Sequence, residues 1–409
     1  MEENEKLIPK RRFKEFQNTQ AWEQRKLGDM ADIVRGASPR PIKDPKWFDY
    51  ESDIGWLRIS DVTEQDGRIH YLEQRLSVSG QEKTRILTEP HLLLSIAATV
   101  GKSVINYVKT GVHDGFLIFQ NPVFDREFMF QWLEMFRPKW SKYGQPGSQV
   151  NLNSDLVKDK TIMMPEVAEQ TQIGQFFAAV DNLITLHQRK LEKTKALKTA
   201  YLSEMFPAEG ESEPKCRFAG FTDAWEQRGW KDTVDISTDM VDPRTGKYDN
   251  LLHIGPGSIE SFSGRLFDNV NTVKEDNLIS GKFYFKKGDV IYGKINPQLG
   301  KYIYAPFEGL ASADAYVLNA KNGLDQTFLF TLLQTRHFFK YSISVSMRSG
   351  MPKINRDELN EYYFNVPSLQ EQERIGGFFL DLDNLITLHQ RKLEKLQNIK
   401  KAYLNEMFI

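Results

Sequence analysis

Two stretches of the chain carry apolar residues at alternating spacings of four and three, which is the pattern of a helix with one apolar seam. The first seam runs from Ile173 to Met205, and the second runs from Ile375 to Met407. A helix of about 38 residues would be ~57 Å long at 1.5 Å per residue. The pattern therefore predicts two long amphipathic helices, one in the middle of the chain and one at its end.

Both seams are interrupted at one equivalent position, by Lys198 in the first and by Lys400 in the second. A lysine in an apolar seam must either leave it or find a partner for its charge. We expect the neighbouring Leu197 and Ile399 to take over the apolar contact, so that the helices are not straight supercoils throughout.

The two helices belong to a repeat that covers the whole chain. The peptide DNLITLHQRKLEK occurs at residues 181–193 and again, letter for letter, at residues 383–395. The middles of the two halves, residues 27–164 and 229–366, share only an apolar skeleton. The halves therefore share a fold but not a surface. Shorter correspondences support the repeat. AWEQR occurs at residues 21–25 and again at 224–228, and less exact matches link HDGFLI with ADAYVL, EFMFQWL with TFLFTLL, and EQTQIGQFF with EQERIGGFF.

The two middles are rich in short β-like runs that are punctuated by Gly, Pro and Asn. HLLLSIAA and GFLIFQ are examples in the first middle, and GDVIYGKI and AYVLNA are examples in the second. One helical patch follows these runs in each half, at residues 127–136 and 327–339. Each middle is therefore predicted to form an α+β domain.

Two equal apolar seams in one chain can bury each other, which favours helices that pack together over helices that lie only on their own domains. The predicted fold is α+β, with two globular domains in a pseudo-two-fold arrangement joined by two long antiparallel coiled-coil helices. The predicted boundaries are 1–165 for an N-terminal arm and the first globular domain, 166–206 for the central helix, 207–213 for a polar linker, 214–367 for the second globular domain and 368–409 for the C-terminal helix.

Composition places the chain among ordinary globular proteins, with 40% apolar and 27% charged residues in 409. A single cysteine, Cys216, excludes an internal disulfide framework and indicates a reducing compartment. The basic N-terminal residues precede no apolar segment, and no apolar run is long enough for a membrane span, so we expect a cytoplasmic protein. The formal charge of −1 means that a nucleic-acid partner would have to meet local basic patches.

Catalytic and metal-binding patterns do not stand out. Seven scattered histidines without a cysteine partner give no zinc spacing, and His187 and His389 lie in the seams, where hydrogen-bonded core histidines are expected. Residues 96–103, IAATVGKS, end like a phosphate-binding loop, but Ile96 stands where that loop needs glycine. No nucleophile and base pair is recognisable. We predict a non-catalytic chain that binds no cofactor and no metal.

With these motifs the chain resembles, over nearly its full length, the specificity subunit of type I restriction-modification systems. The specific parts are the entry PxxRFxxFxxxW at residues 214–225, the Gly-Lys loops at Gly101 and Gly300, and the two helices with EQxxIGxFFxxxDNLITLHQRKLEK. The resemblance implies a DNA sequence-recognition subunit. Each globular domain would then be a target-recognition domain that reads one half of a bipartite, asymmetric site on double-stranded DNA.

The resemblance also implies partners. Two modification (methyltransferase) subunits would bind the helices and bring S-adenosylmethionine, and two restriction subunits that use ATP and Mg²⁺ can join them. Two modules at a fixed separation would contact half-sites about one helical turn, ~34 Å, apart. Two alternatives stay open on the residues alone. One is a tandem coiled-coil adaptor whose globular domains bind protein, and the other is a methyltransferase that acts alone, which would need a cofactor loop.

Amide and cationic side chains in turn-rich loops can pair with base edges and phosphates. The loops at residues 99–102 and 294–301 lie between predicted strands, and the segments 143–151 and 346–353 combine glycines with such side chains. For each residue a solvated loop position is the alternative. We predict DNA contacts for Thr99, Lys102, Gln145, Ser148, Gln149, Lys294, Asn296, Gln298, Lys301 and Arg348.

Overall fold

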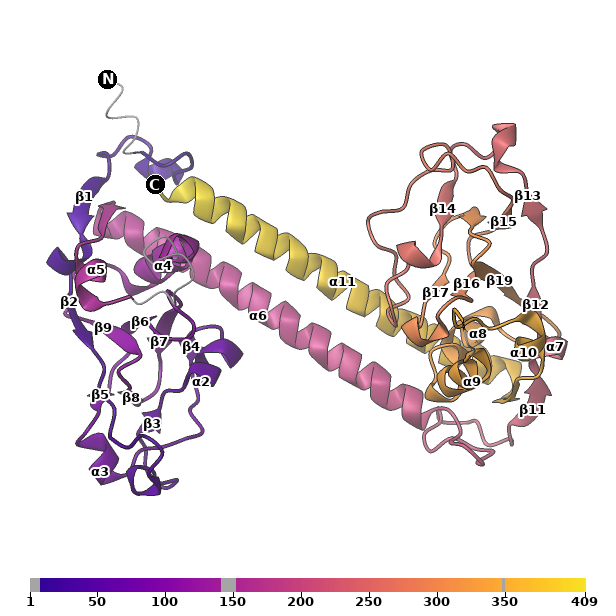
Figure 1. Cartoon of the computed structure of the whole chain (residues 1–409), viewed down its shortest axis with the longest axis horizontal. Coiled ribbons are helices and arrows are strands. Elements are labelled where there is room, and N and C mark those ends of the chain that lie inside the picture. Colours follow the sequence, from indigo (N-terminus) through magenta and orange to yellow (C-terminus); the bar gives the residue numbers. More distant parts are fainter. Residues whose placement is uncertain (1–7, 141–151, 348–349) are drawn as a thin grey trace. The chain divides into compact units, whose positions relative to one another are not determined.

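The computed structural model of the chain describes residues 8–140, 152–347 and 350–409. It contains two compact units: unit 1 is Met1–Leu186 with Glu394–Ile409, and unit 2 is His187–Leu393. The long helices α6 (Val167–Glu204) and α11 (Leu369–Met407) each belong partly to both units (Figure 1). The mixture of sheets and helices confirms the α+β class. Among the described residues, no helix combines the length and the apolar character that a membrane span requires.

We call the part of each unit outside α6 and α11 its head. The head of unit 1 contains η1 (Lys14–Phe16), β1 (Glu23–Lys26), η2 (Leu27–Asp29), β2 (Asp32–Arg35), η3 (Pro45–Trp47), β3 (Gly55–Trp56), α2 (Ile59–Glu64), β4 (Arg68–Ile69), α3 (Val78–Gln81), β5 (Arg85–Leu87), β6 (Leu92–Ser95), β7 (Ser103–Asn106), β8 (Thr110–Val112), β9 (Phe116–Gln120), α4 (Arg126–Trp140), α5 (Ser154–Lys158) and β10 (Thr161–Met164).

A five-stranded sheet in the order β2-β9-β6-β7-β4 forms the centre of this head. Successive side chains of a strand point to opposite faces. In β9, Leu117 and Phe119 therefore join the large apolar cluster that includes α4 and the start of α6. Phe116 and Ile118 join a second cluster on the other face. Because both faces are covered, this strand is apolar at four successive positions rather than at every second one.

The head of unit 2 contains β11 (Glu226–Gly229), α7 (Trp230–Thr233), β12 (Val234–Ile236), β13 (Met240–Val241), η5 (Pro243–Thr245), β14 (Leu252–Ile254), η6 (Pro256–Ser258), β15 (Lys282–Phe285), β16 (Val290–Gly293), η7 (Pro297–Leu299), β17 (Tyr302–Tyr304), β18 (Gly309–Ala311), β19 (Ala315–Ala320), α8 (Gln326–Leu332), α9 (Arg336–Ser346), α10 (Arg356–Asn360) and β20 (Tyr363–Val366). Its sheets have the orders β12-β19-β16-β17 and β13-β15-β18-β14.

This head repeats the burial pattern of the first. In β19, Tyr316 and Leu318 join one apolar cluster, and Ala315 and Val317 join another. One predicted element differs, because the single helical patch expected at residues 327–339 is divided into α8 and α9. The side chain of Thr335 accepts a hydrogen bond from the backbone N–H of Phe338. This N-cap starts a new helix where the pattern suggested continuation.

Within unit 1 the two long helices pack on each other and run antiparallel. The rings of Phe176 and Tyr403 are 5.4 Å apart between centroids. One turn further along α6, the carboxylate of Asp181 lies 2.6 Å from the ammonium of Lys400. Residue numbers rise along α6 while they fall along α11, so the predicted antiparallel pairing is confirmed in this unit.

Unit 2 holds the same pairing with the helices exchanged. Tyr201 packs against Phe378, and the ammonium of Lys198 pairs with the carboxylate of Asp383. The expectation that Leu197 would replace the lysine in the seam is wrong, because Lys198 is 8% exposed and Leu197 is 40% exposed. Burial raises the pKa of Asp383, while Lys198 opposes that change. The lysine can stay in the seam since the repeat supplies its counter-charge.

The two seam histidines meet each other in unit 2. Nδ1 of His187 and Nδ1 of His389 are 3.1 Å apart, so one of the rings donates a hydrogen bond to the other. Both rings are half-buried. The two histidines therefore form a hydrogen-bonded pair in the interface between the helices, as expected for seam histidines.

Each head is completed by the end of the helix from the other repeat. Phe408, which follows α11, lies against Trp22 in the core of unit 1. Phe206, which follows α6, lies against Trp225 in the core of unit 2. Each long helix therefore packs on its own head near its start and on the other head near its end. The similar sequences of the two helices agree with these similar demands.

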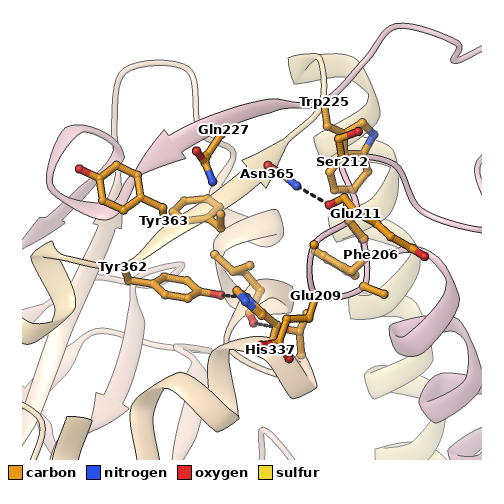
Figure 2. A pocket seen from close by; sticks show the side chains of 16 residues that line it. Phe206, Glu209, Glu211, Ser212, Trp225, Gln227, His337, Tyr362, Tyr363 and Asn365 are labelled. Atoms are coloured by element: carbon orange, nitrogen blue, oxygen red, sulfur yellow. Dashed lines mark hydrogen bonds between the residues drawn. The ribbon is translucent and has the colours of Figure 1, made fainter. Parts of the chain in front are cut away.

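The segment predicted to be a linker lies against unit 2. Residues 207–212 line a cavity of ≈ 400 Å³ beside β11 and β20 (Figure 2). The side-chain amide of Asn365 donates to the backbone oxygen of Glu211 at 3.1 Å. The carboxylate of Glu209, which also lines this cavity, lies 3.5 Å from the ammonium of Lys340.

The exchange of helix ends gives a direct prediction. Phe408→Ala should raise amide hydrogen exchange in the head of unit 1, because losing a buried phenylalanine costs about 3–5 kcal/mol. Phe206→Ala should instead raise exchange in the head of unit 2. Hydrogen-exchange mass spectrometry of the full chain measures both, and each variant is the control for the other. If Phe408→Ala loosened the head of unit 2 rather than that of unit 1, the assignment of the cores would be wrong.

Candidate functional site

A basic surface in unit 2 is assembled from two segments that are distant in the sequence. The loop between β16 and β17 begins at Lys294, whose backbone oxygen accepts from the N–H of Ile354 at 3.0 Å. The N–H of Asn296 donates to the backbone oxygen of Pro352 at 2.8 Å. Asn296 has a φ of 51°, a left-handed conformation that asparagine adopts more readily than most residues. These bonds fix the loop to the segment that carries Lys353.

Three cations, Lys294, Lys353 and Arg356, form what we call the basic cluster. The ammonium of Lys294 lies 5.3 Å, and the guanidinium carbon of Arg356 5.7 Å, from the centre of the Tyr316 ring. Burial lowers the pKa of Lys294, and the charges of Lys353 and Arg356 lower it further against the opposing effect of Asp314. Among the residues that the structure describes, the guanidinium of Arg356 donates to the backbone oxygens of residues 236 and 237. Crowded cations of this kind are stabilised by an anion.

Two amide side chains stand beside the basic cluster on the same loop. Gln298 is exposed, and its amide nitrogen lies 3.3 Å from the amide oxygen of Asn296. Such amides can form paired hydrogen bonds with base edges, whereas cations suit phosphates. The structure therefore brings together three residues singled out from the sequence, Lys294, Asn296 and Gln298.

Lys301, at the other end of the loop, is engaged inside the head. Its ammonium donates to the backbone oxygen of Ile259 and lies 5.5 Å from the centre of the Phe267 ring. The side chain thereby ties the loop to the preceding segment. A DNA contact for Lys301 stays a prediction.

The equivalent loop of unit 1 is closed by internal contacts. Lys102 is buried and lies 2.7 Å from a carboxylate oxygen of Asp66 and 3.1 Å from one of Glu134. Burial would lower the pKa of Lys102, but these two carboxylates raise it above its ordinary value. The hydroxyl of Thr99 donates to the hydroxyl of Ser95 at 3.1 Å. Both side chains are used in holding the loop, and DNA contacts for Thr99 and Lys102 stay predictions.

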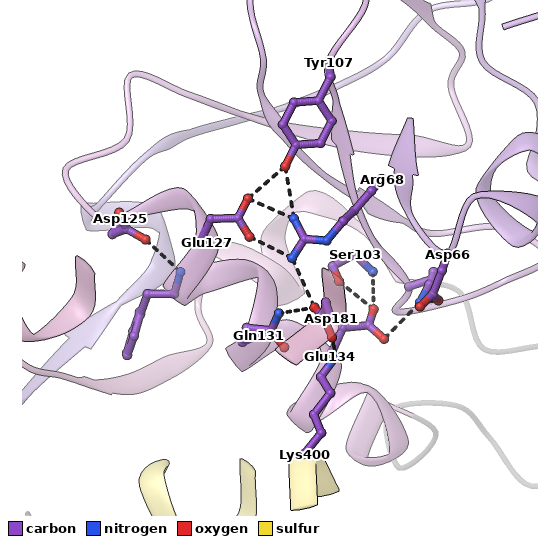
Figure 3. A network of polar contacts seen from close by, with 12 residues as sticks. Asp66, Arg68, Ser103, Tyr107, Asp125, Glu127, Gln131, Glu134, Asp181 and Lys400 are labelled. Carbon is purple, nitrogen blue, oxygen red and sulfur yellow. Dashed lines mark hydrogen bonds and ion pairs between the residues drawn. The ribbon is translucent and has the colours of Figure 1, made fainter. Parts of the chain in front are cut away.

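A polar network connects this head of unit 1 with the long helices (Figure 3). Arg68 lies 2.8 Å from Glu127 on α4 and 3.2 Å from Asp181 on α6. Asp181 in turn pairs with Lys400 of α11. The guanidinium of Arg68 also stands 4.5 Å from the centre of the Phe130 ring. A buried guanidinium needs several acceptors, and this arrangement fixes the head on the helix pair.

A second polar cluster in unit 1 was missed by the sequence analysis. The carboxylate of Asp114 lies 2.7 Å from the guanidinium of Arg40 and accepts from the hydroxyl of Ser38 at 2.7 Å. Arg35 donates to the backbone oxygen of Asp114. Burial alone would raise the pKa of Asp114, but Ser38 and the two arginines lower it. The signal was present, because HDGFLI and ADAYVL place Asp114 and Asp314 at equivalent positions.

Lys353 and Arg356 were also missed, although the segment that ends in Lys353 was singled out. The repeat contained a signal for Arg356. LNSD in the first half corresponds to INRD in the second, so that Arg356 stands where the first half has Ser154. Among the described residues, no group of three or more His, Cys, Asp or Glu side chains could hold a metal ion. Four of the predicted contacts lie outside the described residues: Gln145, Ser148, Gln149 and Arg348.

Comparison with known proteins places both repeats in one family. The family model described as type I restriction modification DNA specificity domain matches residues 19–196 and 230–398. The EcoDI type I restriction enzyme specificity subunit of Escherichia coli is 26% identical over 311 residues, which cover 69% of each chain. The MjaVIII specificity subunit of Methanocaldococcus jannaschii is 21% identical over 407 residues, covering 94% of this chain and 91% of that protein.

A solved structure shares the fold. The S subunit of a type I restriction-modification system from M. genitalium superposes with a TM-score of 0.67 at 12% identity, covering 98% of this chain and 99% of that one. At this identity the likeness shows the architecture alone.

The two loop lysines should differ in what they do for stability. Lys102→Met should lower the free energy of unfolding by roughly 3 kcal/mol, because it leaves the half-buried Glu134 without its counter-charge. Lys294→Met should leave stability unchanged or raise it, because it relieves the repulsion within the basic cluster. Urea denaturation of the full chain measures both variants. A Lys294→Met variant that lost as much stability as Lys102→Met would show that Lys294 also has a structural role.

Proposed function

The chain belongs to the family of type I restriction modification DNA specificity domains, and from that premise we propose that it is the DNA-recognition subunit of a type I restriction-modification complex. The relatives named as specificity subunits align with it over most of their length. The two heads would each read one half of a bipartite, asymmetric site. Two different half-sites fit two heads that share an apolar skeleton and differ in their loops.

The basic cluster is the observation that carries DNA binding. A chain with a net charge of −1 exerts no general attraction on DNA, so binding must rely on local cations. Lys294, Lys353 and Arg356 supply three on one loop surface, with one opposing carboxylate nearby. We assign the cations to phosphates, and the amides of Asn296 and Gln298 to base edges.

The duplicated peptide suggests two copies of one protein partner. In unit 1, Leu183 and Leu186 are each 45% exposed, and in unit 2 their repeat counterparts Leu385 and Leu388 are 44% and 45% exposed. Large apolar side chains with equal exposure on both helices are typical of docking surfaces. We assign one modification subunit to each pair. These subunits would bring S-adenosylmethionine, and restriction subunits would bring the chemistry of ATP and Mg²⁺, so that this chain contributes recognition in the cytoplasm.

Neutralising the basic cluster should weaken DNA binding. The triple variant Lys294→Ala, Lys353→Ala, Arg356→Ala should bind the target duplex about tenfold or more weakly, and the slope of affinity against salt should fall by about one for each lost phosphate contact. Fluorescence anisotropy titrations at several salt concentrations measure both quantities. Lys231→Ala removes an exposed lysine of the same head outside the cluster and is the control. Unchanged affinity and slope in the triple variant would refute the assignment.

The leucine pairs should each hold one partner. Replacing Leu183 and Leu186 by Asp should reduce the number of bound modification subunits from two to one, because a charge on the docking surface opposes its burial. The same change at Leu385 and Leu388 should do likewise, and all four changes together should abolish binding. Native mass spectrometry counts the subunits. Leu369→Asp, at an exposed leucine outside the duplicated peptide, is the control. A fourfold variant that still bound two subunits would exclude this surface.

A further inference from the structure

Unit 2 contains a cavity of ≈ 620 Å³ between its head and the two long helices. Small molecules bind in cavities of roughly 300–1,000 Å³ that combine apolar walls with a few polar groups. This cavity has aromatic walls and a floor that includes the pair Lys198 and Asp383. The repeat allows its lining to be compared, position by position, with the equivalent region of unit 1.

Two carboxylates of unit 1 have no equivalent in this cavity. Gln334 and Ser263 line the cavity. In the first repeat the corresponding residues are Glu134 and Asp66, as the alignment of EFMFQWL with TFLFTLL and of the Gly-Arg pairs at residues 67–68 and 264–265 shows. Glu134 and Asp66 neutralise a buried lysine in unit 1. In unit 2 both positions are uncharged.

Two cations have been added at the same place. Lys195 and Arg336 line the cavity, and the corresponding residues of unit 1 are Gln397 and Phe136. These four differences make the cavity more positive. Two other lining positions differ in the opposite direction, because Glu260 stands where unit 1 has Thr63, and Thr199 stands where unit 1 has Lys401. The net difference is two positive charges in favour of the cavity of unit 2. Both added cations are exposed, so their charges are accessible to a ligand.

The carboxylates that remain are already neutralised. Asp383 pairs with Lys198, and Glu260 lies 3.0 Å from the guanidinium of Arg265. Lys195 has only a 4.0 Å contact with Glu192, and Arg336 forms no ion pair with the residues that the structure describes. The cavity thus holds two cations in excess, which is the charge that an anionic ligand requires.

An aromatic side chain is held at this cavity in a strained conformation. Phe262 has a φ of 58°, which is rare for a bulky residue, and it is 52% exposed. Its ring packs edge-on against Phe339 at 5.3 Å between centroids. Gly300 makes room for it, since a Cβ at that position would lie 2.5 Å from the Phe262 ring. Strain that the surrounding structure maintains is concentrated at ligand sites.

We propose that this cavity binds a molecule the size of a mononucleotide, with a planar ring and a phosphate. The ring lies against Phe262 and Phe339, where stacking on exposed aromatic faces is available. The phosphate faces Lys195 and Arg336. The same chemistry is present in a free nucleotide and in a nucleotide of bound DNA.

Isothermal titration of the full chain with AMP, GMP and CMP tests this site. At least one of them should bind with a dissociation constant below ~1 mM, and adenosine and ribose 5-phosphate, which lack the phosphate and the ring respectively, should bind more weakly than AMP. The double variant Lys195→Ala, Arg336→Ala should bind about tenfold or more weakly, because charge-assisted hydrogen bonds are lost. Lys190→Ala, at an exposed lysine of the same helix outside the cavity, should bind like the unchanged protein.

Phe262→Gly separates binding from folding. Glycine adopts a positive φ without strain, so this variant should keep or raise the thermal unfolding temperature while it binds the nucleotide more weakly. Failure of all three nucleotides to bind at 1 mM, or equal binding by the double variant, would overturn the proposal. If a saturating target duplex displaces AMP, the natural occupant is a nucleotide of bound DNA. If AMP still binds, the occupant is a free nucleotide, and the site stands in either case.

Discussion

The rest of the structure depends on the burial of each helix seam against the other repeat. Near its start, each long helix packs on the head that precedes it in the chain, and near its end it contributes aromatic residues to the core of the other head. Phe206 against Trp225 and Phe408 against Trp22 are the clearest cases. Neither head has a complete core without the far end of a helix from the other half. Substitutions in one helix therefore affect both units.

Buried charge makes the pairing specific. Lys198 with Asp383 and Lys400 with Asp181 repeat one ion pair in the two units. Such pairs add little net stability, but a seam that slipped would leave the charges unpaired at a cost of several kcal/mol, on the order of 3–5. In unit 1 the pair is extended by Arg68 into a network that holds the head. In unit 2 the equivalent pair, Lys198 and Asp383, lines the cavity that we propose as a ligand site. The two units therefore share one architecture but differ at this position.

Sequence patterns predicted the two long helices because apolar periodicity over more than thirty residues is a strong signal. The observed helices begin and end within two residues of the predicted limits. The same patterns gave the wrong burial for Lys198. Its partner Asp383 lies 185 residues away in the chain, and only the antiparallel register of the two helices brings the two residues together. Lys102 shows the same difficulty. A lysine after glycine looks like a free loop cation until Asp66 and Glu134 are brought beside it. The basic cluster was only partly visible, since Lys353 and Arg356 reach Lys294 through backbone pairing of distant segments.

Recognition by two independent heads on shared helices can be tested by exchanging one head. Residues 27–164 can be replaced by the equivalent region of another specificity subunit, and the methylated bases can then be mapped by sequencing DNA from cells that carry the chimera and its modification subunit. One half of the methylated site should change while the other half stays the same. A change in both halves at once, or in neither, would contradict the account.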